Sequence, residues 1–141
     1  MPVLRGKISQ DEYKLGHFDD SANVLDFVCS NDLLPLAALG TSCPDHFLRT
    51  KIRPFVIDFD PASPDFDRLV AGLDDALAAY RAEYLAYYTR CKHDNSPAVR
   101  DANPIIYLIP GVGMLSFAKD KATARIAGEF YVNAINVMRG A

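Results

Sequence analysis

Histidine is scarce in this sequence, and the few histidines lack the spacing that metal sites use. His17, His46 and His93 are the three histidines among 141 residues, and they lie far apart in three different contexts. No HxH or HExxH motif places two imidazoles on one face of a strand or helix. Because a metal site needs three or four convergent ligands, we expect this chain to bind no metal by itself.

Cysteine is also scarce. Cys29, Cys43 and Cys91 are an odd number of thiols without a CxxC motif. This pattern argues against a disulfide framework and against a zinc knuckle. We therefore expect the three thiols to be reduced.

Long apolar runs are missing as well. No run approaches the roughly 20 residues that a membrane helix needs, and the opening MPVLRGKIS has no long apolar core of the kind found in signal peptides. We therefore expect a cytoplasmic protein without a membrane partner.

Positive charge is not in excess, because 15 Lys and Arg residues face 18 Asp and Glu residues, for a formal charge of -3. Nucleic-acid binding proteins display clustered Lys and Arg, so we expect no nucleic-acid partner. By contrast, half of the residues are hydrophobic, and the length suits one compact core.

Strands and helices are predicted to alternate along the chain. Residues 13–18, 54–58 and 105–109 have strand patterns, and residues 111–120 read as a glycine-containing connection that could include a short strand. Helical patterns cover residues 22–30, 32–39, 63–92 and 121–138. This alternation predicts an α/β fold, with a three-layer, mostly parallel, Rossmann-like sheet and helices on both faces, forming a single domain over residues 1–141.

One predicted helix is longer than a small domain is wide. Its pattern starts with a Ser63 cap and Pro64 at the first helical position and continues to about Lys92, roughly 40 Å at ~1.5 Å per residue. Four tyrosines crowd its C-terminal half, namely Tyr80, Tyr84, Tyr87 and Tyr88. We expect this end to contact another domain or subunit. The polar segment 93–104 that follows is predicted to be a loop.

The segment 40–51 is the candidate site, because it is the one stretch where chemically active side chains gather. It is expected to be a loop at a sheet edge, where ligands of open α/β sheets bind. The candidate ligand-binding residues are Ser42, Cys43, Asp45, His46, Arg49, Thr50 and Lys51.

Two interpretations of this segment stay open. His46 beside Asp45 could be an oriented imidazole, with Cys43 as a nucleophile or Lys51 as a phosphate contact. Alternatively, Asp45 caps the turn and Cys43 is a small buried hydrophobe.

A second candidate segment is PGVGM, residues 110–114. Gly111 and Gly113 follow a predicted strand, as at the start of a dinucleotide fingerprint, but Ser116 stands where its third glycine belongs. Either the backbone contacts an anion here, or it forms a tight turn that needs positive φ. Together with the 40–51 loop, this turn could form a binding module for a phosphorylated sugar or nucleotide.

Longer tracts of the sequence resemble a known family. Residues 14–30 (KLGHFDDSANVLDFVCS), 40–61 (GTSCPDHFLRTKIRPFVIDFDP) and 105–141 are similar to the middle region of bifunctional rhamnulose-1-phosphate aldolase/short-chain alcohol dehydrogenases. In that family a zinc-dependent class II aldolase region precedes the matching segment, and an NAD-binding dehydrogenase region follows it. The resemblance implies a fragment of a longer enzyme of rhamnose breakdown, both oxidoreductase and lyase, which cleaves rhamnulose 1-phosphate and oxidises lactaldehyde with zinc and NAD.

The chain departs from the catalytic patterns of both neighbours. The histidine triad of the aldolase has no matching positions here, and the dehydrogenase's full glycine fingerprint with Ser, Tyr and Lys is missing. We therefore expect no cofactor in this segment and an inactive isolated fragment. Its expected role is a noncatalytic linking or assembly domain that contacts the aldolase and dehydrogenase domains and forms a homo-oligomer. The alternatives are the binding module described above and independent catalysis.

Overall fold

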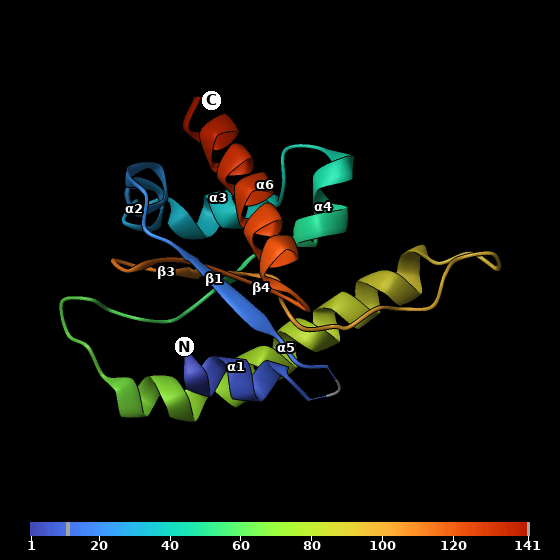
Figure 1. Ribbon diagram of the computed structural model, residues 1–141, viewed down its shortest axis with the longest axis horizontal. Coiled ribbons are helices and arrows are strands. Elements are labelled where there is room, and N and C mark those ends of the chain that lie inside the picture. Colours follow the sequence, from blue (N-terminus) through green and yellow to red (C-terminus); the bar gives the residue numbers. More distant parts are fainter. Residues whose placement is uncertain (11, 141) are drawn as a thin grey trace.

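A four-stranded mixed sheet forms the centre of the computed structural model, which describes residues 1–10 and 12–140 (Figure 1). The strand order is β1-β4-β3-β2. The strands are β1 (Leu15–Asp19), β2 (Phe55–Val56), β3 (Ile106–Ile109) and β4 (Gly113–Ala118). β1 and β3 both pair antiparallel with β4, and only β2 and β3 are parallel.

The prediction of a mostly parallel, Rossmann-like sheet is therefore wrong. The segment 111–120, expected to be a glycine-containing connection that could include a short strand, contains the six-residue strand β4, which folds back on β3 so that Ile109 pairs with Gly113. A short turn can join only antiparallel strands, whereas parallel neighbours need a long crossover. β2 is also shorter than expected, although the Ile57 amide extends its pairing by donating to the Leu108 carbonyl at 2.9 Å.

Helices lie on both sides of the sheet, as expected (Figure 1). One side carries α2 (Ala22–Val28), α3 (Leu33–Leu39), α4 (Pro44–Thr50) and α6 (Lys121–Gly140), and the other carries α1 (Pro2–Ile8) and α5 (Phe66–Cys91). Helix α1 was not among the predicted helices; it has Pro2 at its start and buries Leu4 and Ile8.

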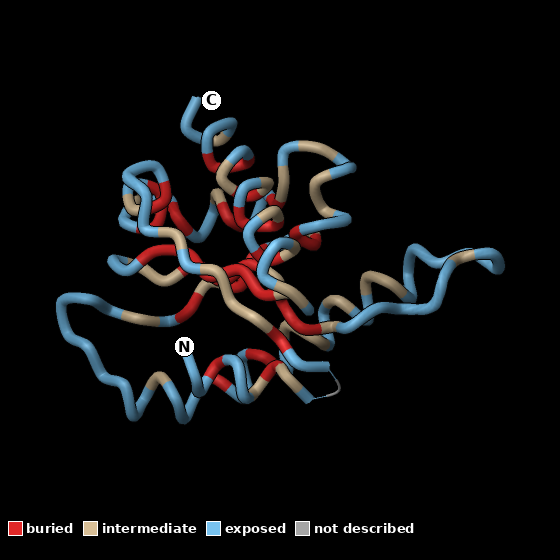
Figure 2. The backbone as a smooth tube through the Cα atoms, viewed as in Figure 1, coloured by how far each residue is buried: buried red, intermediate tan, exposed pale blue. Residues whose placement is uncertain are grey.

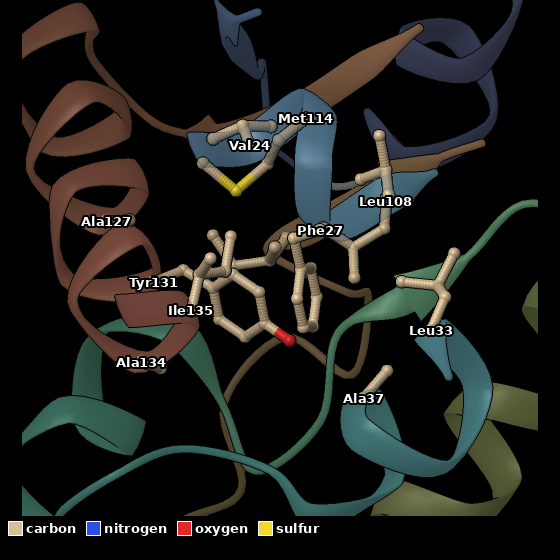
Figure 3. Close-up of a cluster of buried hydrophobic side chains, with 12 residues drawn as sticks. Val24, Phe27, Leu33, Ala37, Leu108, Met114, Ala127, Tyr131, Ala134 and Ile135 are labelled. Carbon is tan, nitrogen blue, oxygen red and sulfur yellow. The ribbon is translucent and has the colours of Figure 1, made fainter. Parts of the chain in front are cut away.

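Side chains of the central strands alternate between two cores, as the two-residue period of a strand requires. Ile106 and Leu108 of β3 pack toward α2, α3 and α6, whereas Tyr107 packs toward α1 and α5. On β4, Met114 joins the first core, and Leu115 joins the second. Figure 3 shows the first core, in which Tyr131 and Ile135 of α6 meet Phe27 of α2 and Leu108.

The 26-residue helix α5 is confirmed, but it begins at Phe66 rather than near Ser63. The Asp65 side chain caps the helix by accepting a hydrogen bond from the Arg68 amide at 2.9 Å. Leu73 and Leu77 are buried against the sheet, whereas Phe66 is 65% exposed and not part of the core. The C-terminal part of α5 and the segment after it project from the body and are mostly exposed (Figures 1 and 2). We call residues 80–104 the arm.

No single helix in the described residues is long and apolar enough to cross a membrane. Within those residues, only α2 and α3 taken together, which meet at a bend of 107°, are long and apolar enough by length and composition alone. Val24, Phe27 and Val28 of α2 are buried in the first core.

Candidate functional site

The segment 40–51 is not the open loop that the sequence indicated. Gly40 ends α3 with φ 91°, and a Cβ there would lie 2.6 Å from the Ile52 carbonyl oxygen. Pro44 then starts the short helix α4, which has Asp45 in its first turn. Proline at the first helical position and an acid in the first turn are ordinary start signals. The helix arranges the candidate side chains on different faces rather than gathering them at a sheet edge.

His46 contributes to the packing of α4 on α6. Its ring meets the Phe130 ring edge-on, with 4.8 Å between the centroids. Its Nδ1 lies 3.2 Å from the Ser42 Oγ. Asp45 and Arg49 are exposed, and Cys43 is half-buried at the N-cap of α4. Thr50 is buried, and its hydroxyl donates to the carbonyl oxygens of the residues at 46 and 51, which closes the end of the helix.

Lys51 is the most unusual residue of the segment. It ends α4 with φ 64°, in the left-handed region that residues other than glycine rarely adopt. The residue is 7% exposed, and its ammonium lies 3.8 Å from the centre of the Tyr84 ring and donates to the Asp101 carbonyl oxygen. Burial lowers the pKa of Lys51 to about 8, because desolvation disfavours the charged form more strongly than Asp101 favours it.

Lys51 belongs to a polar junction at the base of the arm that sequence reasoning missed. The Lys14 ammonium lies 2.9 Å from the Asp101 carboxylate and 2.5 Å from that of Glu12. Asp101 also accepts from the Asn103 backbone amide at 2.9 Å. The Asn103 side-chain oxygen in turn accepts from Arg81 Nε at 2.7 Å. We call residues Lys14, Lys51, Arg81, Asp101 and Asn103 the junction.

Lys14 and Asp101 stabilise each other's charged forms within the junction. Burial disfavours the charge of Lys14, but hydrogen bonds to Glu12 and Asp101 outweigh it, so the pKa of Lys14 is raised. Burial likewise raises the pKa of Asp101, but the Asn103 amide and the Lys14 ammonium outweigh it and lower the pKa overall. The junction thus joins α5, the residues before β1 and the end of the polar segment. In a linear sequence, nothing marks these scattered residues as neighbours.

The second candidate segment is a hairpin turn between β3 and β4. Gly111 has φ 70° and Gly113 has φ 139°, so a tight turn that needs positive φ accounts for both glycines. A Cβ on Gly113 would lie 2.7 Å from the Asp19 carbonyl oxygen, and one on Gly111 would lie 2.8 Å from Pro61. In a dinucleotide fingerprint the glycines join a strand to a helix. Here they join two antiparallel strands, so the turn does not fit a pyrophosphate site of that kind.

Two cavities are the best formed in the described residues, and neither is lined by both candidate segments. A groove of about 280 Å³ lies between the exit of β2 and the first half of α5. A hollow of about 370 Å³ lies between residues 28–34 and Pro110. Gly111 lines the hollow, whereas residues 42–51 line neither. The joint binding site for a phosphorylated sugar or nucleotide therefore stays a prediction.

The donor groups that the structure describes do not fit a zinc ion. Within residues 1–10 and 12–140, no three His, Cys, Asp or Glu side chains come close enough to hold a metal. His17 lies on β1, His46 on α4, and His93 follows α5, so three different elements carry the imidazoles.

Comparisons with known proteins relate the chain to an oxidoreductase and to class II aldolases. The chain is 37% identical over 141 residues to the "Uncharacterized oxidoreductase YuxG" of Bacillus subtilis (strain 168). The match covers 100% of this chain but only 20% of that relative, so the chain spans about one fifth of its length. No solved structure matches the chain.

The family comparison covers the whole sequence. The family described as "Aldolase class II, second domain" matches residues 1–141. Together with the oxidoreductase name of the relative, this match supports the aldolase and oxidoreductase parts of the resemblance. The chain belongs to the family of class II aldolase second domains.

Proposed function

We propose that this chain is a noncatalytic assembly domain of a longer bifunctional enzyme of rhamnose breakdown. In this proposal a class II aldolase part, which cleaves rhamnulose 1-phosphate at zinc, precedes the chain. A short-chain dehydrogenase part, which oxidises lactaldehyde with NAD, follows it. The family match, the oxidoreductase name of the relative and the small share of the relative's length that the chain covers support this arrangement.

The observation that carries the proposal is the projecting arm. α5 is about 39 Å long at 1.5 Å per residue, and its outer end extends beyond the sheet that its first half covers (Figure 1). Leu85 and Val99 on the arm are 43% and 40% exposed. A protruding helix with apolar residues on its surface is typical of elements that contact another domain or subunit.

Internal contacts also occupy three of the polar groups that first suggested chemistry, namely those of His46, Thr50 and Lys51. Lys51 is held by Tyr84 and Asp101, and Thr50 closes the end of α4. The ring of His46 packs on Phe130. These side chains fasten α4 and the arm to the body, which is a structural role and suits a domain that holds its neighbours in place.

An activity assay of the purified 141-residue chain tests the noncatalytic part of this proposal. We expect no NADH from NAD and lactaldehyde, and no aldehyde from rhamnulose 1-phosphate with zinc. Turnover in either assay, retained after a second purification step, would overturn the proposal.

Binding and the flanking coding sequence test the assembly part. The chain should bind separately purified aldolase and dehydrogenase domains of the same longer polypeptide, or itself. The flanking sequence should encode a histidine pair upstream and a glycine fingerprint downstream. A strict monomer that binds neither domain would remove the assembly role.

A further inference from the structure

Charge is separated along α5 and its flanking segments. Residues 57–76 contain six aspartates and one arginine, whereas residues 89–100 contain three cations and one aspartate. We call the first group the acidic end and the second the arm tip. The acidic end consists of the start of α5 and the chain that leads into it, and the arm tip lies at the opposite end of the long axis (Figure 1).

The acidic end contains the groove of about 280 Å³. Phe59, Leu69 and Leu73 contribute apolar surface to it, and Asp58 and Asp65 lie among the residues that line it. The Asp58 side chain is 94% exposed and 3.6 Å from Arg68, itself 79% exposed. Such an exposed pair contributes little. Asp74 also pairs with Lys7 at 2.6 Å, so the negative potential of the acidic end comes mainly from its other four aspartates, Asp60, Asp65, Asp67 and Asp75.

The arm tip has the matching chemistry. Its cations are Arg90, Lys92 and Arg100, and none of them pairs with a carboxylate in the part of the chain that the structure describes. The exposed residues Pro97 and Val99 lie between Lys92 and Arg100 in the sequence. An apolar segment flanked by cations complements an apolar groove with carboxylates around it.

We propose that a second copy of this chain covers the exposed face of α5. The two α5 helices then lie antiparallel, and each arm tip binds the partner's acidic end. This inference rests on the proposed assembly role and names its partner. The two complementary surfaces lie at opposite ends of one helix, so a twofold axis across the middle of α5 satisfies both contacts at once. Ala79, Ala82 and Ala86 are exposed between the two ends, where short side chains let two helices approach closely.

Paired charge reversals test the arrangement. An arm variant carries Lys92→Glu and Arg100→Glu, and an acid variant carries Asp58→Lys, Asp60→Lys and Asp75→Lys, which leaves three aspartates against four cations in residues 57–76. None of the acid-variant positions caps α5, because that role belongs to Asp65. A control variant with Lys119→Glu and Lys121→Glu makes the same charge change as the arm variant, but next to the start of α6. Circular dichroism verifies that each variant is folded.

We expect the wild-type chain and the control variant to sediment as dimers at low salt. Each reversal variant alone should dissociate at least tenfold more readily, because both of its reciprocal contacts become repulsive. An equimolar mixture of the two variants should restore the dimer, since opposite charges then face each other at both contacts. A monomeric wild type overturns the inference. The inference is also overturned if the charge reversals leave dimer dissociation unchanged, or if the mixture stays monomeric while both variants are folded.

A salt titration of the wild type needs no variant and keeps the inference testable if a reversal unfolds the chain. Raising the ionic strength from about 0.05 M to about 0.5 M shortens the range of electrostatic attraction severalfold. We expect the dimer dissociation constant to rise at least tenfold, and an unchanged constant would overturn the inference.

The result can be separated from the proposed function. A monomer that still binds the aldolase or dehydrogenase domain leaves the assembly role intact and overturns only the pairing of two copies through α5.

Discussion

The Lys51 ammonium lies 3.8 Å from the centre of the Tyr84 ring, which places a buried cation at the base of the arm. Its pKa is lowered to about 8, from 10.5 for an exposed lysine. Between these two pH values the unfolded chain binds more protons than the folded chain, so this group makes stability rise with pH. Relative to Lys51→Met, the free energy of unfolding of the wild type should rise by about 1 kcal/mol per pH unit between about pH 8 and 9.5.

Urea unfolding at several pH values measures this difference. The comparison stays below pH 10 because burial raises the pKa of Tyr80 and Tyr107, and their ionisation in the unfolded chain opposes the lysine effect above that pH. Lys119→Met, at an exposed position, is the control and should parallel the wild type. A wild-type curve parallel to that of Lys51→Met would show that the ammonium is not desolvated.

The ion pair between Lys14 and Asp101 should contribute more than the contact between Lys14 and Glu12. The side chain of Lys14 is only 10% exposed, against 39% for Asp101 and 54% for Glu12. We expect Asp101→Asn to cost about 1–2 kcal/mol near pH 7, and Glu12→Gln to cost less than about 0.5 kcal/mol.

The effect of Asp101→Asn should depend on pH in a definite direction. The folded-state pKa of Asp101 lies below its ordinary value of 3.8, so the stabilisation is present above that pH and is lost as the pH falls below it. Urea unfolding at pH 7 and pH 3 should show the difference between wild type and Asp101→Asn shrink at the lower pH. An equal difference at both pH values would contradict this assignment.

Gly113 should tolerate no side chain. Its φ of 139° strains any other residue, and a Cβ would lie 2.7 Å from the Asp19 carbonyl oxygen. We expect Gly113→Ala to cost about 2 kcal/mol or more, measured as a lower midpoint in urea. Gly6→Ala on α1 is the matched control, because nothing lies within 4 Å of its added Cβ and helix propensity favours alanine by up to about 1 kcal/mol. Equal effects of the two substitutions would refute the close approach.

His46 should matter for packing rather than for ligands. His46→Ala removes the edge contact with Phe130 and the hydrogen bond to Ser42, which we expect to cost about 1 kcal/mol. Thermal shift assays with phosphorylated sugars and nucleotides should leave the melting temperature of the wild type unchanged. A ligand-induced rise that Lys51→Ala and His46→Ala both abolish would favour the binding-module alternative.

Much of the local structure was predictable because its signals are short-range. Residues 22–28 form the expected helix after a strand, and α5 and α6 follow the three- and four-residue spacing of their apolar side chains. The start signals of α4 were also present, in Pro44 and Asp45. They were not recognised because polar side chains dominate that segment and favoured a loop.

The candidate site was less predictable than the elements. The segment 40–51 does contain Lys51, the buried residue that ends α4, but the partners of Lys51 are Tyr84 and Asp101. Asp101 lies in a polar segment expected to be a loop, and its anchoring role depends on Lys14 and Asn103.

The sequence by itself determined most of the helices and strands and which of their faces are apolar, because periodicity and capping act between residues a few positions apart. Only the tertiary structure decided the direction of the strands and the neighbours of the buried charges. An alternating pattern buries the same faces whether its partner is parallel or antiparallel, so β4 could be placed between β1 and β3 only once the chain had folded. For the same reason, the burial that sets the pKa of Lys51 comes from side chains distant along the chain.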